Sequence, residues 1–442
     1  MSLPQDTDVL IVGAGMAGVT TAWALRQVGI RSIVLEAQDR IGGRIQTSRK
    51  WKKIPCDMGA GWVSHPTINP LIEIARKKKI ELSPSDLSKI AIHDYSNDEV
   101  DDLWGLYGTA YAGVKLEAES RRDQGKRDIG LSPVLPGVLD TMNLDPKTRR
   151  GIEFFIDTSI TQAYAADQKD LSLYNWDDNY TELFLGLWIV PDGYIRFVEM
   201  LKKGLDIRTE TVVCEIDRDE QGVFVKTRSY GEFRAPYAVV TVPHGVLAKG
   251  HIKFTPPLPP WKQEAIDRVR TGLSDKFWFH FPRKFWKSKR AVVGRADPEG
   301  KWSLWLNFEK YHDNEPVLLA FNRTRYAAKL EKMSDDAVVA EAMAVLRKEY
   351  GRRTPDPIAM QRSTWGTNEF SEGTITHLPP GASAEDYLTL GKPVGRLRFA
   401  GDSTCPEFNL QVIGAFWSGV REAERVTSDM LMSRRGPKSA RV

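Results

Sequence analysis

The segment 8–36, DVLIVGAGMAGVTTAWALRQVGIRSIVLE, limits the fold of this chain more than any other stretch. An apolar run at 9–12, typical of a buried strand, leads directly into a G-x-G-x-x-G motif formed by Gly13, Gly15 and Gly18. The apolar spacing that follows predicts a helix ending before Gly29, and a second strand is predicted at 32–35. The motif alone is a weak signal, but with a strand, a helix and a second strand around it the pattern is specific. The chain is therefore predicted to begin as a βαβ unit of an α/β fold.

The glycines and the acid that ends the second strand have separate roles in binding a dinucleotide. Gly13 permits the tight turn, Gly15 lets the backbone approach a pyrophosphate, and Gly18 lets the helix pack close to the sheet. The N–H groups at the helix N-terminus would point at the phosphates, and Glu36 would accept hydrogen bonds from the adenosine ribose. The sequence therefore predicts a dinucleotide site at the start of the chain.

The residues after the second strand indicate which dinucleotide binds. The segment E-A-x-x-R-x-G-G-R, which starts at Glu36, contributes Arg40, Gly43 and Arg44. A nicotinamide dehydrogenase has no need of this second glycine pair, whereas the segment resembles the flavin-containing amine oxidase superfamily. The resemblance implies that the cofactor is FAD and that these residues contact it.

Further motifs follow in the order of that family, from about residue 8 to 430. DMGAGW (57–62) is similar to the flavin-pocket turn, which implies that Gly61 and Trp62 lie beside the ring. TETVVCEI (209–216) is similar to a strand whose valine, here Val213, contacts the adenine. The block that begins LRFAGDSTCPEF near the C-terminus resembles the second FAD-binding block. It implies cofactor contacts for Gly401, Asp402, Val412 and Ala415.

The order of the motifs implies two interleaved domains. A discontinuous Rossmann-type FAD-binding domain is expected from residues 1–80, 205–275 and 393–442. An α+β substrate-binding domain is expected from residues 81–204 and 276–392. Its predicted elements are strands at 301–308 and 316–321 and helices at 140–164 and 334–350.

The segment TGLSDKFWFHF (271–281) places a lysine in an aromatic-rich strand. Strand alternation sends Lys276, Trp278 and His280 to one face and the phenylalanines to the other. An ammonium that loses hydration among aromatic rings has a lowered pKa unless a partner compensates. The preceding segments AVVTVPHGVL and IKFTPPLPPWKQEA are similar to polyamine oxidases, which aligns Lys276 with the family lysine that holds a water against flavin N5. The resemblance implies that Lys276 is catalytic; a solvent-facing lysine at a strand end is the alternative.

Several positions expected at the flavin and the substrate depart from the family. Monoamine oxidases attach FAD through a cysteine where this chain has Thr374, so non-covalent FAD is expected. Ile375 and Gln411 occupy the positions of two aromatic rings that face the flavin in many members, while Trp365 is a candidate wall of the site. Other candidate substrate contacts, each with a structural role as the alternative, are His65, Glu407 and Asn409.

The resemblance implies an FAD-dependent amine oxidase acting on a small-molecule amine. It would oxidise a C–N bond to an imine, which water hydrolyses, with O2 reoxidising the flavin and releasing H2O2. Polyamine-type or alkaloid-type amines are favoured over simple monoamines. The missing aromatic pair leaves open an L-amino-acid oxidase, in which Arg323 or Arg325 could hold the carboxylate, or a desaturase-like or isomerising flavoenzyme. A non-catalytic flavin-binding protein is the third alternative.

Composition limits the partners and the compartment. Lys and Arg (62) nearly balance Asp and Glu (58), so no concentrated basic surface for nucleic acid is expected. The three cysteines lack metal-ligand spacing, so neither a metal site nor a disulfide framework is expected, and a reducing, cytoplasmic location is favoured. No signal peptide and no apolar run of about 18 residues is visible, so no membrane association is expected. The sequence does not fix the oligomeric state, and a homodimer is compatible with it.

Overall fold

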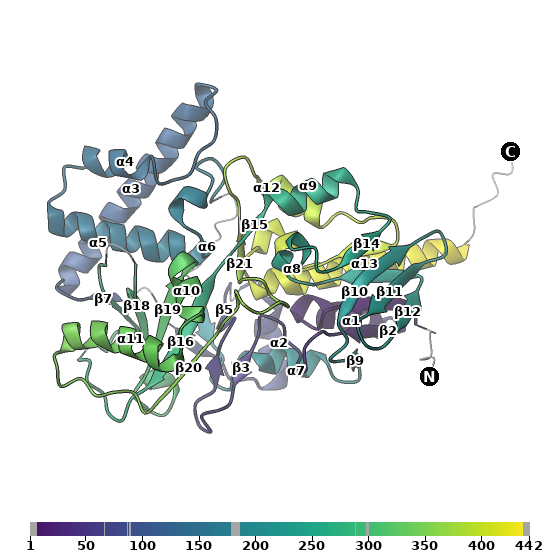
Figure 1. Cartoon of the computed structure of the whole chain (residues 1–442), viewed down its shortest axis with the longest axis horizontal. Helices are drawn as coiled ribbons and strands as arrows, with labels where there is room; N and C mark the ends of the chain where they lie inside the picture. Colours follow the sequence, from purple (N-terminus) through teal and green to yellow (C-terminus); the bar gives the residue numbers. More distant parts are fainter. Residues whose placement is uncertain are drawn as a thin grey trace. The chain divides into compact units, whose positions relative to one another are not determined.

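The computed structural model of the chain describes residues 7–435, except 66, 86, 88–89, 178–185, 288 and 298–299. The chain divides into two compact units, each assembled from segments far apart in sequence (Figure 1). The first unit comprises Met1–Gln46, Ile195–Asp267 and Ala384–Val442, and the second comprises Thr47–Tyr194 and Arg268–Ser383. The boundaries differ from those expected, because residues 47–80 and 268–275 fall in the second unit, and 195–204 and 384–392 in the first.

The first unit is organised around a five-stranded sheet in the order β22-β13-β1-β2-β9, in which every neighbouring pair is parallel. The central strand β1 is apolar and buried at every position, as a parallel strand covered on both faces requires. This is the predicted Rossmann-type α/β arrangement. Its strands are β1 (Val9–Val12), β2 (Ser32–Leu35), β9 (Asp206–Arg208), β13 (Tyr237–Val240) and β22 (Leu397–Phe399).

Two helices from opposite ends of the sequence pack together in the first unit. Helix α1 (Met16–Gln27) begins within the glycine motif, and α13 (Val412–Arg435) begins within the second predicted cofactor block. The Thr21 hydroxyl of α1 donates to the Gly419 carbonyl of α13 at 3.2 Å, so the two backbones approach closely. The N-terminal and C-terminal blocks therefore form one structure. The other helices of the unit are α7 (Ile195–Leu201), α8 (His244–Ala248), α9 (Pro260–Arg268), α12 (Ala384–Leu390) and the short 3-10 helices at Asp402–Thr404 and Pro406–Phe408.

A second sheet in the first unit has the order β12-β11-β10-β14. The predicted strand at 209–216 begins later than expected, at Val213, because Glu210 has a left-handed backbone conformation with φ of 54°. The strands are β10 (Val213–Arg218), β11 (Val223–Thr227), β12 (Glu232–Ala235) and β14 (Lys253–Thr255).

The second unit contains a six-stranded sheet in the order β20-β16-β19-β18-β17-β7. Two strands of this sheet were predicted near their observed positions: β18 within 301–308 and β19 at 316–321. The expected strand 271–281 is broken at Leu273 into β15 and β16, and β15 pairs separately with β21. The strands are β7 (Ile90–Ile92), β15 (Arg270–Gly272), β16 (Ser274–His280), β17 (Val292–Gly294), β18 (Leu304–Asn307), β19 (Val317–Arg323), β20 (Ala359–Arg362) and β21 (Ile375–His377).

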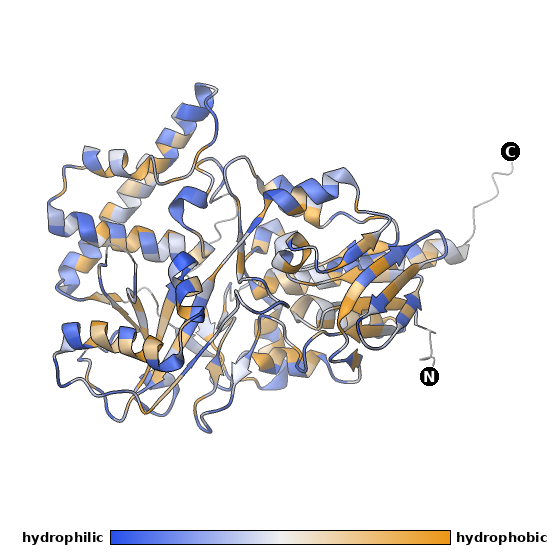
Figure 2. Ribbon diagram, in the orientation of Figure 1, coloured by the Kyte–Doolittle hydropathy of each residue, from blue (hydrophilic) through white to orange (hydrophobic). Residues whose placement is uncertain are grey.

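The two faces of β16 differ in the way that alternation predicted. Phe277, Phe279 and Phe281 are fully buried in an aromatic and aliphatic core with residues of α11. Lys276 and Trp278 point to the other face of the sheet and are also buried, at 6% and 1% exposure. The hydropathy colouring of Figure 2 shows apolar residues along the strands of this unit. Lys276 is therefore not a solvent-facing lysine at a strand end.

Helices cover the sheet of the second unit. The prediction of a helix at 334–350 is confirmed by α11 (Asp335–Tyr350). The expected helix at 140–164 is wrong as a single element, because the chain is not helical at 142–145, where Asn143 has φ of 50°. The helical segment begins at Pro146 and continues to Tyr164 through a π-helical turn at Asp157–Thr161. The remaining helices are α2 (Pro70–Lys78), α3 (Asn97–Asp123), α4 (Leu135–Thr141), α5 (Pro146–Ile156), α6 (Gln162–Tyr164) and α10 (Thr324–Glu331), with 3-10 turns at Gln168–Asp170 and Glu309–Tyr311.

Small sheets complete the second unit. One has the order β5-β8-β6 and carries Trp62, and the other pairs β3 with β4. Their strands are β3 (Thr47–Ser48), β4 (Cys56–Asp57), β5 (Trp62–Val63), β6 (Ser83–Ser85) and β8 (Leu187–Ile189).

Candidate functional site

The glycine motif in the first unit forms a tight turn between β1 and α1. Gly13 has φ of +104°, a conformation that favours glycine, and its N–H donates to the Leu35 carbonyl at 2.8 Å. A Cβ on Gly18 would lie 2.0 Å from the Gly13 carbonyl oxygen, which no side chain could tolerate. A Cβ on Gly15 would instead meet only the Gly42 carbonyl, at 3.9 Å, so the backbone is open to a ligand there.

The start of α1 has the properties of an anion site. Its N-cap is Gly15, which supplies no side-chain capping bond, and the first turn contains no acidic residue. The N–H groups and the positive end of the helix dipole are therefore not neutralised by a side chain. These observations fit a pyrophosphate at the position that the motif predicted.

Glu36 lies directly after β2 and is 5% exposed. One of its carboxylate oxygens accepts a hydrogen bond from the Ala14 N–H at 2.6 Å, and the other accepts one from the Gln38 N–H at 2.9 Å. Burial raises the pKa of Glu36, while these N–H groups and Arg40 oppose the rise. The carboxylate is thereby fixed beside the glycine turn, and each oxygen keeps a lone pair that could accept a ribose hydroxyl.

Arg44 joins the two predicted cofactor blocks. Its guanidinium pairs with the Asp402 carboxylate at 2.5 Å, across 358 residues of sequence. Asp402 follows Gly401, whose φ is +145°, and is itself buried. The Arg40 guanidinium donates to the Gly43 carbonyl at 2.9 Å and so supports the loop rather than pointing away from it. The structure thus brings Arg40, Gly43, Arg44, Gly401 and Asp402 into one unit.

The remaining candidates of the first unit lie apart from the glycine turn or around the start of α13. Val213 opens β10 and is buried in the smaller sheet. Val412 and Ala415 belong to the first turn of α13, and the carbonyl oxygen of Gln411 accepts hydrogen bonds from its backbone. Glu407 is exposed, whereas Asn409 is 3% exposed and its side-chain oxygen has no hydrogen-bond partner among the described residues. Asn409 therefore has an unused acceptor, and no contact of Glu407 in the structure indicates a ligand.

In the second unit, a carbonyl group and aromatic rings surround the Lys276 ammonium. Its ammonium donates to the Asp57 carbonyl at 3.1 Å and lies 4.6 Å from the centre of the Trp62 ring. The Phe321 ring is 5.7 Å away. A Cβ on Gly61 would lie 3.0 Å from Nζ, so glycine at this position leaves room for the ammonium. The turn DMGAGW therefore supplies three of the surroundings of Lys276: Asp57, Gly61 and Trp62.

Burial is the largest cause of the pKa shifts of Lys276 and of its neighbours Asp57 and Cys56. It lowers the pKa of Lys276 to about 8, although the neighbouring carboxylate of Asp57 opposes the change. Burial also raises the pKa of Asp57 to about 6, against the effects of Lys276 and of hydrogen bonds from Thr47 and Tyr194. The Cys56 thiol has a raised pKa for the same reason, so it is a neutral neighbour. Lys276 can therefore lose or gain a proton close to neutral pH, as residues that handle protons in catalysis often do.

Trp365 belongs to the same group of residues. It is 4% exposed, its indole N–H donates to the Met58 carbonyl at 3.0 Å, and its backbone N–H donates to the Asp275 carboxyl at 3.2 Å. Trp365 and Lys276 thus both hydrogen-bond to the turn that begins at Asp57. The structure supports a common location for the predicted lysine and the predicted tryptophan wall.

Other predicted substrate contacts in the second unit are less informative. His65 has φ of +53°, and its carbonyl accepts bonds from the start of the loop before α2, which is a structural role of its backbone. Ile375 begins β21 and pairs with Gly272 in register. Ile375 lies in the second unit and Gln411 in the first, so neither unit by itself contains both positions of the missing aromatic pair.

The two arginines considered for a substrate carboxylate have other partners. Arg323 is 5% exposed and forms an ion pair with Asp157, with Gln162 accepting a further hydrogen bond at 3.4 Å. The Arg325 side chain is 79% exposed and lies 3.7 Å from Asp167. Neither arrangement resembles a buried cation awaiting a ligand.

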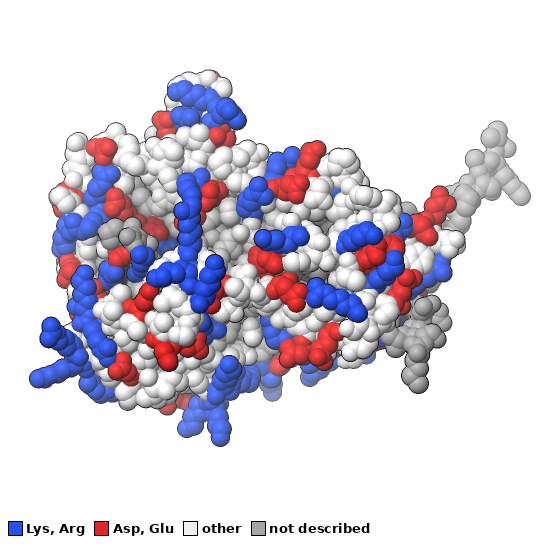
Figure 3. Space-filling model, viewed as in Figure 1, with Lys and Arg blue, Asp and Glu red and all other residues white. Residues whose placement is uncertain are grey.

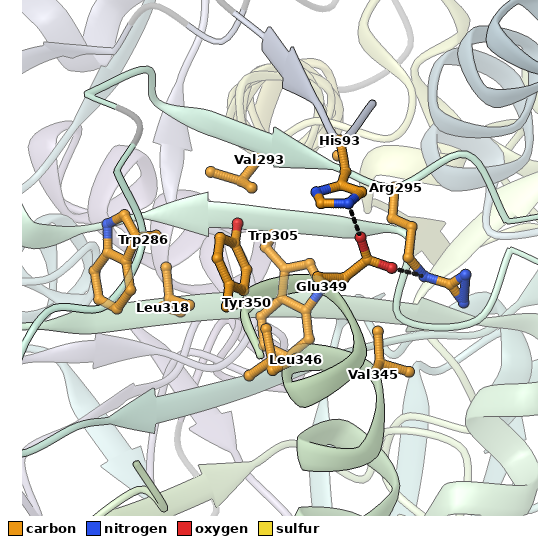
Figure 4. Close-up of a pocket in the computed structure, with 11 residues that line it drawn as sticks. His93, Trp286, Val293, Arg295, Trp305, Leu318, Val345, Leu346, Glu349 and Tyr350 are labelled. Carbon is orange, nitrogen blue, oxygen red and sulfur yellow. Dashed lines mark ion pairs between the residues drawn. The ribbon is translucent and has the colours of Figure 1, made fainter. Parts of the chain in front are cut away.

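A small cavity in the second unit is lined by strands of the six-stranded sheet and by α11 (Figure 4). It lies on the face of the sheet that carries Phe279, opposite to Lys276. Its wall includes Leu318, the cross-strand partner of Phe279, together with Trp305 and Tyr350. At its edge, Glu349 is 3.0 Å from His93 and 3.6 Å from Arg295. The cavity measures about 20 Å³, room for about one water molecule. An amine substrate could not fit there.

The wider molecule adds little to the site. The face shown in Figure 3 has basic and acidic side chains interspersed. The described residues contain no cluster of three or more His, Cys, Asp and Glu side chains suited to a metal ion. All three cysteines are free thiols. None of the described helices is long and apolar enough to cross a bilayer.

Three residues of the site were missed by sequence reasoning. Asp57 was within a recognised motif, but its contact with Lys276 depends on the fold. Thr241 follows β13, and its hydroxyl donates to the Val12 carbonyl at 2.9 Å and to the Gly13 carbonyl at 3.1 Å, which supports the glycine turn. Asp275 precedes Lys276, and the aromatic pattern around it indicates only a strand. A charged residue amid an aromatic strand was the one available signal for Asp275.

Comparisons with known proteins identify the family of the chain and its fold. The family model for flavin containing amine oxidoreductase matches residues 16–427. The chain is 31% identical to "Polyamine oxidase 2" of Arabidopsis thaliana, over 95% of this chain and 88% of that protein. It is 30% identical to "Lysine-specific histone demethylase 1 homolog 3" of the same species, over 97% of this chain but 30% of that protein. The structure of cyclohexylamine oxidase from Brevibacterium oxydans IH-35A matches 96% of this chain and 100% of its own, with a TM-score of 0.79 and 22% identity, and shows that the fold is shared.

Proposed function

This chain belongs to the flavin-containing amine oxidoreductase family and is a flavin-dependent enzyme acting on amine groups, and on that premise we propose that it oxidises a C–N bond of a polyamine-type or alkaloid-type amine to an imine. The observation that carries the proposal is the buried Lys276, held at the Asp57 carbonyl and against Trp62. Flavin, when bound, supplies the two-electron oxidant for this reaction. The imine would then be hydrolysed by water, and O2 would be the electron acceptor, with release of H2O2.

We propose that the flavin is FAD and that it is bound without a covalent link. The glycine turn, Glu36 and the Arg44–Asp402 pair would hold it, since these are the groups that suit a pyrophosphate and a ribose. Thr374, at the position of the family's attachment cysteine, accepts a hydrogen bond from the Ser274 N–H and donates one to the Gly272 carbonyl. A threonine hydroxyl with this structural role cannot form a thioether.

Purified protein is therefore expected to be yellow and to lose its flavin on acid precipitation or heating. Absorbance of the supernatant, followed by chromatography against FAD and FMN standards, measures both identity and attachment. Flavin that stays with the precipitated chain would contradict non-covalent binding. A colourless protein that cannot be loaded with FAD would contradict the proposed cofactor altogether.

Lys276 is proposed as the catalytic side chain. Its lowered pKa lets it exchange a proton near neutral pH, and its hydrogen bond to the Asp57 carbonyl uses one of its N–H groups, so that others can hold a water or a substrate atom. Asp57 lies next to Lys276 and supplies negative charge that keeps its pKa from falling further. Trp62 and Trp365 form apolar walls that limit water around the amine.

A polyamine-type substrate is preferred because several relatives aligned over most of this chain and most of their own length are polyamine oxidases. The chain aligns with under a third of the histone demethylase homologue, which does not favour a chromatin substrate. An L-amino-acid oxidase is disfavoured by the ion pairs of Arg323 and Arg325. A cytoplasmic location, independence from nucleic acid and membranes, and a homodimeric state remain proposals from the sequence.

A further inference from the structure

Asp275, next to Lys276 on β16, is a completely buried carboxyl group. One oxygen, Oδ1, accepts hydrogen bonds from the Ser363 hydroxyl at 2.6 Å and from the Trp365 N–H at 3.2 Å. The other oxygen, Oδ2, is buried and accepts no hydrogen bond from the described residues. An ionised carboxylate in the protein interior needs donors for both oxygens, so this asymmetry requires an explanation.

A second carboxyl group lies beside it. Glu331 is the last residue of α10, and its Oε1 accepts a hydrogen bond from the Gly366 N–H at 2.7 Å. The Trp365 and Gly366 amides are consecutive, so they hold the two carboxyl groups next to each other. Burial, together with the charge of Glu331 and a hydrogen bond to it, raises the pKa of Asp275 well above its ordinary value. Two adjacent carboxyl groups, one of them completely buried, repel each other strongly when both are ionised.

Among the described residues, the cations on the strands beside Asp275 do not pair with its carboxyl group. Its cross-strand partner on β19 is the neutral Asn322. Arg362 of β20 binds the Leu330 and Met333 carbonyls and pairs with Asp335 at 2.9 Å. Arg323 pairs with Asp157, and Lys276 points to the opposite face of β16. The charged groups on the strands packed against Asp275 are therefore already engaged elsewhere.

We propose that Asp275 is a neutral carboxylic acid that donates its Oδ2–H to the Glu331 carboxylate, and that this pair is a positioning device for Lys276 and Trp365. The hydroxyl group of Ser363 accepts a hydrogen bond from the Lys276 N–H at 3.0 Å, and the Ser363 N–H donates to the Lys276 carbonyl. Asp275 thus holds the 363–366 loop, and the loop holds the backbone of Lys276 and the indole of Trp365. The positioning role rests on the proposed function, whereas the protonation of Asp275 does not.

The proton on Asp275 has a definite effect on stability. Because the folded state binds this proton more tightly than the unfolded chain, the contribution is fully present below the ordinary pKa of aspartate, about 4, and is lost as the pH rises toward the raised value. Asp275→Asn removes the titration and keeps the geometry. Its amide oxygen can accept from Ser363 and Trp365, and its amide NH2 can donate to Glu331.

The test compares thermal unfolding of the purified holoprotein and three variants at pH 5 and pH 8. At pH 8 the unfolding temperature of Asp275→Asn is expected to exceed that of wild type by about 2 °C or more, and at pH 5 the difference is expected to be smaller. Asp275→Ala is expected to unfold below wild type at both pH values, because it leaves the Ser363 hydroxyl and Trp365 N–H without an acceptor. The control is Asp177→Asn, since Asp177 is a buried carboxylate with a cationic partner, Lys115, at 2.8 Å. It is expected to lose stability at both pH values.

An ionised Asp275 would give the opposite sign: Asp275→Asn would be less stable than wild type, and more so at pH 8 than at pH 5. That result overturns the proposal, and it can be obtained even if Asp275→Ala does not fold.

The positioning role has a separate readout in anaerobic flavin reduction by a reactive amine. The rate of flavin reduction in Asp275→Asn is expected to be at least about tenfold higher than in Asp275→Ala. Equal rates would show that Asp275 is only structural. Because unfolding needs no substrate, failure of the proposed amine oxidation would leave the protonation test intact.

Discussion

Lys276→Met is expected to leave FAD bound and to slow flavin reduction, reoxidation or both by at least about tenfold, which corresponds to about 1.4 kcal/mol of barrier. Methionine keeps much of the length and the apolar stem of lysine but has no N–H group and no charge. The Asp57 carbonyl loses its 3.1 Å donor, and Asp57 loses the cation that lowers its pKa. Without Lys276 the pKa of Asp57 rises further, which favours the neutral carboxyl in this buried site, so the variant is expected to fold.

Stopped-flow absorbance under anaerobic conditions measures the reduction step, and mixing the reduced enzyme with O2 measures reoxidation. The flavin spectrum and the unfolding temperature show whether the cofactor and fold are retained. Lys249→Met provides a matched control, because Lys249 is exposed at the end of α8 and no part of the site. Rates for Lys276→Met within about twofold of wild type would show that Lys276 is structural.

Gly18→Ala is expected to abolish stable FAD binding. The added Cβ would lie 2.0 Å from the Gly13 carbonyl oxygen and 2.8 Å from the Thr241 hydroxyl. Gly13 cannot easily move away, since its own φ of +104° and its bond to Leu35 fix the turn. Helix α1 must therefore shift away from β1. Overpacking usually lowers the free energy of unfolding by about 1–3 kcal/mol, and the loss here is expected near or above the upper end of that range.

Flavin content per chain and the unfolding temperature are the measurements for this variant. Gly105→Ala is the matched control, because Gly105 is exposed in the long helix α3 and a Cβ there would meet nothing within 4 Å. That control is expected to retain flavin and to gain about 0.5–1 kcal/mol in stability from better helix propensity. Full flavin content and an unchanged unfolding temperature in Gly18→Ala would contradict the role assigned to the glycine turn.

The parts of the molecule that depend on local backbone geometry could be predicted from sequence. Gly13, Gly15 and Gly18 each serve a turn or contact within a few residues of themselves, and the structure gives each the predicted geometry. The faces of β16 also followed from alternation alone. The π-helix at Asp157–Thr161 was missed because apolar spacing does not reveal one additional residue in a turn.

Contacts between distant segments could not be predicted. The Arg44–Asp402 pair joins residues separated by 358 positions, and each was expected to contact the cofactor rather than the other. The Asp275–Glu331 pair depends on where α10 ends relative to the loop at Trp365 and Gly366. The lysine was found because motifs flank it, whereas the groups that set its pKa, above all Asp57, required the three-dimensional arrangement.

Anaerobic bleaching of the bound flavin against a panel of amines tests the central claim most directly. The panel should contain polyamines, cyclic and alkaloid-type amines, simple monoamines and L-amino acids, with each compound mixed with wild type and with Lys276→Met. We predict that at least one polyamine-type or alkaloid-type amine bleaches the wild-type flavin, and that Lys276→Met responds at least about tenfold more slowly or returns more slowly to the oxidised form with O2. Bleaching by L-amino acids alone, or by none of the compounds, would contradict the proposed function.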